Sequence, residues 1–116
     1  MIESILDSVK SVLGIDAADS GFDQSLLIFI NSVMFDLREM GVGPTSGFMV
    51  TGRTETWTNF IGTSPLIGVL PGFVGLKVRL LFDPPTTSYL NDNITKQLDQ
   101  MAYRLVNSST QSTPTP

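Results

Sequence analysis

The sequence FDQSLLIFINSVMFDLREMGVG, residues 22–43, carries the clearest helical pattern in this chain. Apolar side chains recur in it at three- and four-residue steps, which places them on one face of a helix about four turns long. That face comprises Leu26, Phe29, Ile30, Val33 and Leu37. Outside it stand Leu27, Ile28, Met34 and Phe35. A helix that is apolar on more than one side is either central in its own fold or shared with another subunit.

A shorter helix is predicted before this one. Its apolar face comprises Ile2, Ile5, Leu6, Val9 and Leu13, and its water-facing side comprises Glu3, Asp7 and Lys10. Gly14 supplies a C-terminal stop. Ser20, followed three residues later by Asp23, resembles a capping box for the next helix. Because carboxylates are favoured at helix starts, we interpret Asp16, Asp19 and Asp23 as capping residues rather than calcium ligands.

Residues 42–56 are expected to form an extended arm or a short hairpin. Gly43, Pro44, Gly47 and Gly52 interrupt this segment too often for a helix. After it, Thr54 can cap a short helix that Gly62 ends. The apolar face of that helix would carry Trp57, Phe60 and Ile61.

Two further helices are predicted in the second half of the chain. The first can begin with Ser64 as its cap and Pro65 at its first position, and reach Phe82 with a kink or a late start at Pro71. A firm break follows at Asp83, Pro84 and Pro85. The second helix runs from about residue 87 to 106. Its expected buried residues are Leu90, Ile94, Leu98, Met101 and Leu105.

The predicted fold is therefore mainly α, a small bundle of about four to five helices with the arm between the second and third. Residues 1–106 would form the helical domain. Residues 107–116 contain only Asn, Ser, Thr, Gln and Pro, and a tail of that composition has nothing to bury by itself. We expect it to dock on a partner through Ser108, Thr110, Pro114 and Pro116.

Composition excludes most chemistry for this chain of 116 residues. It has no Cys and no His, which removes thiolate metal sites, cysteine nucleophiles and the commonest general base. Its Ser and Thr residues therefore have no obvious activating base. The Gly-rich residues 68–75 lack the GxxxxGK[ST] pattern of a phosphate-binding loop. No catalytic, metal or cofactor residue is assigned, and the chain is not expected to be an enzyme.

Charge and apolar content indicate the kind of partner. Seven Lys and Arg against eleven Asp and Glu give a net charge of −4, without any basic run, so tight binding to nucleic acid is not expected. Only 16% of residues are charged, below the roughly 25% usual in a soluble domain, and an oligomer interface could cover the spare apolar surface. The most apolar stretch, residues 66–82, is interrupted by glycine, proline and two cations, so no membrane contact is expected.

The aromatic side chains around the arm have two interpretations. Phe48, Met49, Trp57 and Phe60 could in principle stack on single-stranded nucleic acid, but Arg53 is their only cationic neighbour. Packing in the core and contact with another subunit both fit them better, and the sequence does not separate these two.

The order of the segments resembles a known family, the head-tail connector (adaptor or head-completion) proteins of tailed bacteriophages. The segments that carry the resemblance are ILDSVKSVLGI (5–15), residues 22–44, TWTNFIG (56–62) and LKVRLLFDPPTTSYLNDNITKQLDQMAYRL (76–105). The most specific pieces are INSVMFDLREMGVG (30–43) and KVRLLFDPPTTSY (77–89). The resemblance spans residues 2–106. It departs from the family at GVLPGFVG (68–75), where a more regular helix is expected.

The resemblance implies a structural subunit of the virion neck, present in the host cytoplasm during assembly. Copies would form a ring, expected to be twelve-fold, beneath the portal protein, and would meet the next adaptor or the tail-terminator protein. Double-stranded DNA would pass with only weak contact, since a net negative subunit repels it. A phage-encoded helical module that sequesters a host protein is the alternative.

A closed ring requires two complementary patches on each subunit. The wide apolar surface of the second helix and the segment from Phe48 to Phe60 are the expected patches. Their residues are Met34, Phe35, Phe48, Met49, Arg53, Trp57 and Phe60.

Overall fold

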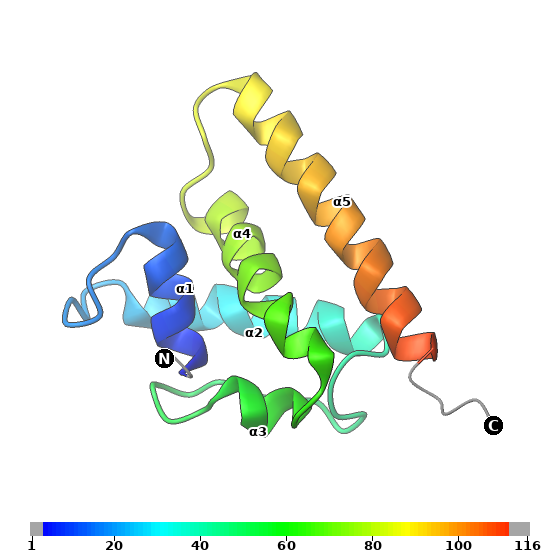
Figure 1. The fold of residues 1–116 in the computed structure, drawn as a ribbon. Coiled ribbons are helices and arrows are strands. Elements are labelled where there is room, and N and C mark those ends of the chain that lie inside the picture. The colour runs from blue at the N-terminus through cyan, green and yellow to red at the C-terminus, as the bar shows by residue number, and fades with distance from the viewer. Residues whose placement is uncertain (1–3, 112–116) are drawn as a thin grey trace.

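A computed structural model describes residues 4–111 of the chain (Figure 1). The elements are α1 (Ile5–Leu13), α2 (Asp23–Glu39), α3 (Trp57–Ile61), the 3-10 turn η1 (Pro65–Gly68), α4 (Leu70–Phe82) and α5 (Ser88–Gln111). The described residues contain no strand, only one isolated bridge between Ser4 and Thr56. The predicted mainly α bundle is confirmed.

Helix α4 is the centre of the bundle, with α1, α2 and α5 all packed against it (Figure 1). Its buried side chains include Leu70, Phe73, Val74 and Val78. Pro71 lies in the first turn, where its missing N–H costs no hydrogen bond, so the helix starts late rather than kinking. The unusual sequence at residues 68–75 therefore positions the helix start and leaves its axis intact.

Gly75 lets α1 approach α4 closely. A Cβ atom at this position would lie 2.7 Å from the side chain of Val12, a distance that real Cβ contacts essentially never show. The interface between α1 and α4 thus depends on the absence of a side chain at residue 75. Close helix packing explains this glycine without any phosphate-binding role.

Lys10 was expected to face water and is instead fully buried. Its Nζ donates to Asp23 Oδ1 at 2.8 Å and to the carbonyl of Ala17 at 3.1 Å. These two bonds tie α1 to the first residue of α2 and close the loop of residues 14–22. A buried ammonium needs such partners, because an unpaired charge in the interior is strongly destabilising.

The predicted caps are corrected at two helix starts. Phe22 is the N-cap of α2 and makes no side-chain capping bond, so Ser20 and Asp23 form no capping box. The reason is that the Asp23 carboxylate pairs with Lys10. The cap of α3 is Thr56, not Thr54, and Asn59 closes a full capping box with it. Gly62 ends α3 as predicted.

The acidic loop before α2 is held by its own turns. Asp16 Oδ1 accepts a hydrogen bond from the amide of Ala18, and Asp19 Oδ1 accepts one from Gly21, both at 2.9 Å. These carboxylates stabilise the loop rather than the N-terminus of the helix, so the capping role predicted for them is wrong.

Helix α5 differs from its prediction at both ends. The break at Asp83–Pro85 is present, and Asn91 Nδ2 donates to the carbonyl of Pro85 at 2.8 Å across it. Leu90 is 48% exposed instead of buried, because the first turns of α5 stand clear of the other helices (Figure 1). The buried face of α5 comprises Ile94, Leu98 and Leu105. The helix continues to Gln111, past the predicted end at residue 106.

Candidate subunit interface

Three of the predicted interface residues lie in the core. Met34, Trp57 and Phe60 are all buried, and Trp57 is only 2% exposed. The indole Nε1 of Trp57 donates to Ser8 Oγ at 2.9 Å, so its one polar atom has a buried partner. Of the two interpretations left open for these aromatic residues, core packing holds for Trp57 and Phe60, and neither offers surface to a partner in this conformation.

Phe60 is enclosed from the arm side by Gly43 and Phe48. A Cβ at Gly43 would lie 2.4 Å from Phe60 Cε1, and the backbone φ of Gly43 is +89°. The Phe48 ring meets the Phe60 ring edge-on, with centroids 5.2 Å apart. Phe48 is half-buried, so it connects the arm to the core.

The arm, residues 42–56, lies against the body and is held mainly by side chains, with one isolated backbone bridge between Thr56 and Ser4 at its end. Asn31 on α2 bonds both backbone groups of Val50: its Nδ2 donates to the carbonyl at 3.0 Å, and its Oδ1 accepts from the amide at 2.8 Å. Arg38 Nε donates to the carbonyl of Thr45 at 2.8 Å. The arm therefore forms no hairpin and follows the C-terminal half of α2.

A third attachment links the far end of the arm to α1. The guanidinium of Arg53 donates to both carboxylate oxygens of Asp7, at 3.0 Å to Oδ1 and 3.1 Å to Oδ2. The hydrogen bond and the charge of Asp7 raise the pKa of Arg53 above its ordinary value. Arg53 is exposed, so this pair fixes the direction of the arm more than it adds stability.

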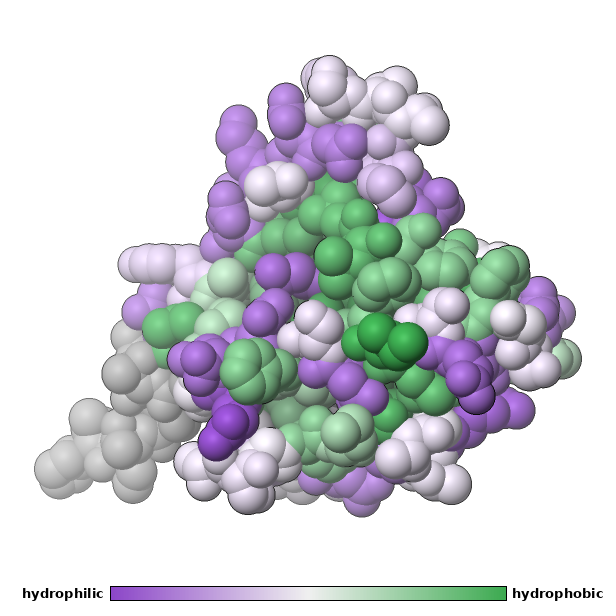
Figure 2. All heavy atoms as spheres, turned by 180° about the vertical axis from the view of Figure 1, so that it is seen from behind, coloured by the Kyte–Doolittle hydropathy of each residue, from purple (hydrophilic) through white to green (hydrophobic). Residues whose placement is uncertain are grey.

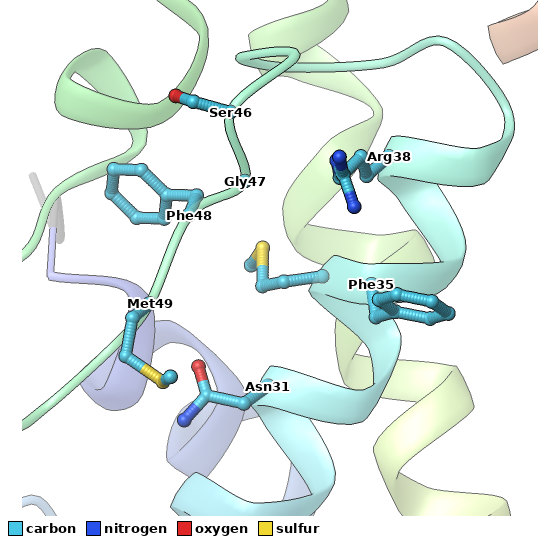
Figure 3. Close-up of a pocket in the computed structure, with 8 residues that line it drawn as sticks. Asn31, Phe35, Arg38, Ser46, Gly47, Phe48 and Met49 are labelled. Carbon is cyan, nitrogen blue, oxygen red and sulfur yellow. The ribbon is translucent and has the colours of Figure 1, made fainter.

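Between α2 and the arm lies an open groove of about 340 Å³. It is lined by Asn31, Met34, Phe35, Arg38, Ser46, Gly47, Phe48 and Met49 (Figure 3). Two apolar side chains at its edges are exposed: Phe35 at 56% and Met49 at 64%. The groove thus combines an apolar rim with one cation, Arg38.

The exposed apolar surface extends along α2 beyond the groove. Ile28 is 69% exposed and lies two turns before Phe35 on the same helix face. At the start of the helix, the Phe22 and Phe29 rings both pack edge-on against Phe82, with centroids 5.4 and 6.3 Å away. The exposed side chains of Phe22, Ile28, Phe35 and Met49 are termed the exposed band. Figure 2 views the molecule from behind and shows apolar side chains over the middle of this face, with hydrophilic side chains between them.

Ile28, Asn31 and Arg38 are absent from the residues predicted as interface. The seven-residue spacing of Ile28 and Phe35, both outside the buried stripe, is the signal that could have identified Ile28. Nothing in the sequence indicates that Asn31 and Arg38 bind an arm many residues away.

The remaining predicted positions fall at the end of the chain. Ser108 and Thr110 belong to the last turns of α5. Pro114 and Pro116 lie outside the described residues. The docking role of these four residues stays a prediction.

Residues 4–111 contain no cluster of acidic side chains that could hold a metal ion. Within the same range, every buried side-chain nitrogen or oxygen has a hydrogen-bond partner. None of the helices described here combines the length and apolarity needed to cross a bilayer.

Comparison with known proteins identifies the family. A family model described as phage connector protein matches residues 5–112, almost the whole chain. No curated protein and no solved structure matches it. The matched range includes every helix of the bundle, the arm and the groove. The chain belongs to the phage connector protein family.

Proposed function

We propose that this chain is the ring subunit of a head-tail connector, docking beneath the portal protein, extending the DNA channel and joining the filled head to the tail. Membership of the connector family makes it a structural component of a phage virion. The family match is the observation that carries the proposal. Ring formation, a twelve-fold count and the identity of the neighbours are parts of the proposal itself.

The surface of the subunit supports assembly with copies of itself. Three large exposed apolar side chains, Ile28, Phe35 and Met49, lie on α2 and the arm beside or near the groove, and an apolar groove of this kind is typical of an interaction site. Other exposed apolar side chains lie on α1, α4 and α5. Subunits in a ring meet through two different faces, and the exposed band provides one of them.

The distribution of cations supports weak contact with passing DNA. Three of the seven cations have carboxylate partners: Lys10 is buried in an ion pair, Arg53 is paired with Asp7, and Lys77 lies 4.0 Å from Asp36. The other four, on α2, α4 and α5, form no basic run in the sequence. Cations already bound to carboxylates contribute little to neutralising phosphates. With a net charge of −4, the subunit suits a channel that DNA must leave again.

Binding to phage heads tests the proposal. Filled heads from a phage lacking this gene should co-sediment with the purified chain, and an axial electron-microscopy image should show a ring of subunits at the portal vertex. Heads that lack the portal are the control and should not bind it. Failure to bind heads, combined with one-to-one binding to a host protein, would favour the sequestering module instead.

A further inference from the structure

The two ends of α2 carry exposed charges of opposite sign without ion-pair partners. At the start, neither Asp16 nor Asp19 forms an ion pair with any described residue. At the end, Arg38 uses Nε to bind Thr45 and has no carboxylate partner among residues 4–111. Asp36 and Glu39 also lie at this end but do not line the groove, where Arg38 is the one charged lining residue. The charge of the groove therefore complements that of the acidic loop.

Apolar surface accompanies the charge at both ends. Phe22 adjoins the acidic loop and is 45% exposed, although one edge of its ring packs on Phe82. The groove at the other end has Phe35 and Met49 on its rim beside Arg38. An aromatic ring, Phe22, preceded by the carboxylate of Asp19 matches a groove with an apolar rim and one guanidinium.

One copy cannot make this contact within itself. Asp23 and Arg38 are fifteen residues apart on a continuous helix, which separates them by about 22 Å at 1.5 Å per residue. A second molecule must therefore bring an acidic loop to the groove, and a second copy of this chain carries such a loop. The contact joins two different faces, so each copy keeps one free loop and one free groove until the assembly closes.

We propose that residues 16–22 of one copy dock into the groove between α2 and the arm of the next copy. Phe22 contacts Phe35 and Met49, and the carboxylate of Asp19 faces Arg38. The apolar contacts supply most of the affinity, and the charge pair sets the register. This inference rests on the proposed ring function and names the two faces that the ring uses.

Crosslinking tests the contact directly, because the chain has no native cysteine. Ser20→Cys places a thiol on the loop, and Ser46→Cys places one beside the groove; both serines are exposed. On filled phage heads, where the ring is expected to form, a short bis-maleimide should join an equal mixture of the two variants into heterodimers. The double variant should give a ladder of higher oligomers. Ser11→Cys, at an exposed position on α1, is the matched control and should not link to Ser46→Cys.

Charge reversal gives a second test that depends on the two faces being different. Asp19→Arg and Arg38→Glu should each weaken self-association by about tenfold, because each juxtaposes like charges. An equal mixture of the two variants should assemble as the natural chain does, since alternating copies restore every opposite pair. Native mass spectrometry and crosslinking yield would both measure this.

Two outcomes would overturn the inference. One is crosslinking of Ser20→Cys to Ser46→Cys no stronger than that of the Ser11→Cys control. The other is a mixture of charge variants as defective as each variant alone. If either occurs while the chain still forms a ring on heads, the proposed function stands and only the assignment of faces fails. Absence of any binding to heads would instead overturn the proposed function.

Discussion

At the scale of single residues, a buried hydrogen bond between side chains far apart in the sequence helps to fix how the core packs. Ser8 and Trp57 are 49 residues apart, yet their side chains form a buried hydrogen bond. The indole N–H has no access to water there, so losing its acceptor leaves a buried donor unsatisfied. This bond fixes which face of α3 turns toward α1.

Replacing Ser8 with alanine should therefore lower the free energy of unfolding by about 1–3 kcal/mol. Ser11→Ala, on the exposed side of the same helix, is the control for the change in helix propensity and should shift stability by less than about 0.5 kcal/mol. Urea unfolding followed by the fluorescence of Trp57, the single tryptophan, measures both. Equal effects of the two substitutions would show that the bond does not stabilise the fold.

Gly43 offers a test of how tightly the arm closes over Phe60. Gly41 and Gly43 both have positive φ, at +81° and +89°, so alanine at either position is strained by about 1 kcal/mol. Only at Gly43 would the new Cβ also strike Phe60. Gly43→Ala should therefore be less stable than Gly41→Ala by a further 1–3 kcal/mol or so, as in overpacked cores. Identical melting temperatures would contradict the packing described for Phe60.

At the scale of elements, the ends of helices at glycine and proline residues could be predicted from the sequence. The partners that side chains meet in the folded chain could not. Gly14, Gly62 and Pro84 act locally, so their effect is visible in the sequence. Lys10 resembles a surface residue of α1 until Asp23 supplies a buried partner, a pairing that depends on the path of the loop. For the same reason Leu90 matches the apolar stripe of α5 but extends beyond the helix that could cover it.

The candidate interface was likewise predicted only in part from the sequence. Phe35 and Met49 were predicted as interface and are exposed, whereas Trp57 and Phe60 belong to the core. Hydrophobicity alone cannot make this distinction, because both groups are large and apolar. The path of the arm makes this distinction. The two hydrogen bonds between Asn31 and Val50 hold the arm over Phe60 and leave the Met49 side chain exposed.

The arm also contains a carboxylate whose titration should loosen it in acid. Glu55 accepts hydrogen bonds from the Thr51 hydroxyl at 2.5 Å and from the Gly52 amide at 3.2 Å. The bond from Thr51 is the main cause that lowers the pKa of Glu55 below its ordinary value of 4.5. Its contribution to stability is therefore present above pH 4.5 and lost as the pH falls through the lower, folded-state pKa.

Amide exchange at Gly52 should accelerate below pH 4.5 after correction for intrinsic rates, whereas the Glu55→Gln variant should show little further change in that range. Glutamine keeps an acceptor oxygen but cannot titrate. The effect is modest because Glu55 is largely solvated. Parallel pH profiles in the two proteins would mean that this carboxylate does not hold the turn.

At the scale of the whole molecule, the fold buries its core within one copy and leaves large apolar side chains exposed on α1, α2, the arm, α4 and α5. Helix α4 is enclosed by α1, α2 and α5, so little of the core depends on a neighbour. The exposed band on α2 and the groove beside the arm are what assembly would cover. A monomer that folds alone and assembles on a platform is consistent with this arrangement.

The docking role of the last residues can be tested without disturbing the fold, provided that the truncation leaves α5 complete. A stop after residue 107 would remove the last helical residues as well as the tail, since α5 reaches Gln111. A stop after Gln111 should leave helical circular dichroism unchanged and weaken co-sedimentation with heads by about tenfold, the loss of one contact worth about 1.4 kcal/mol. A variant with residues 112–116 replaced by glycine and serine is the length-matched control and should bind as weakly as the truncation. Undiminished binding by the truncated chain would show that residues 112–116 do not dock, leaving Ser108, Thr110 and the groove on α2 as the candidate contacts.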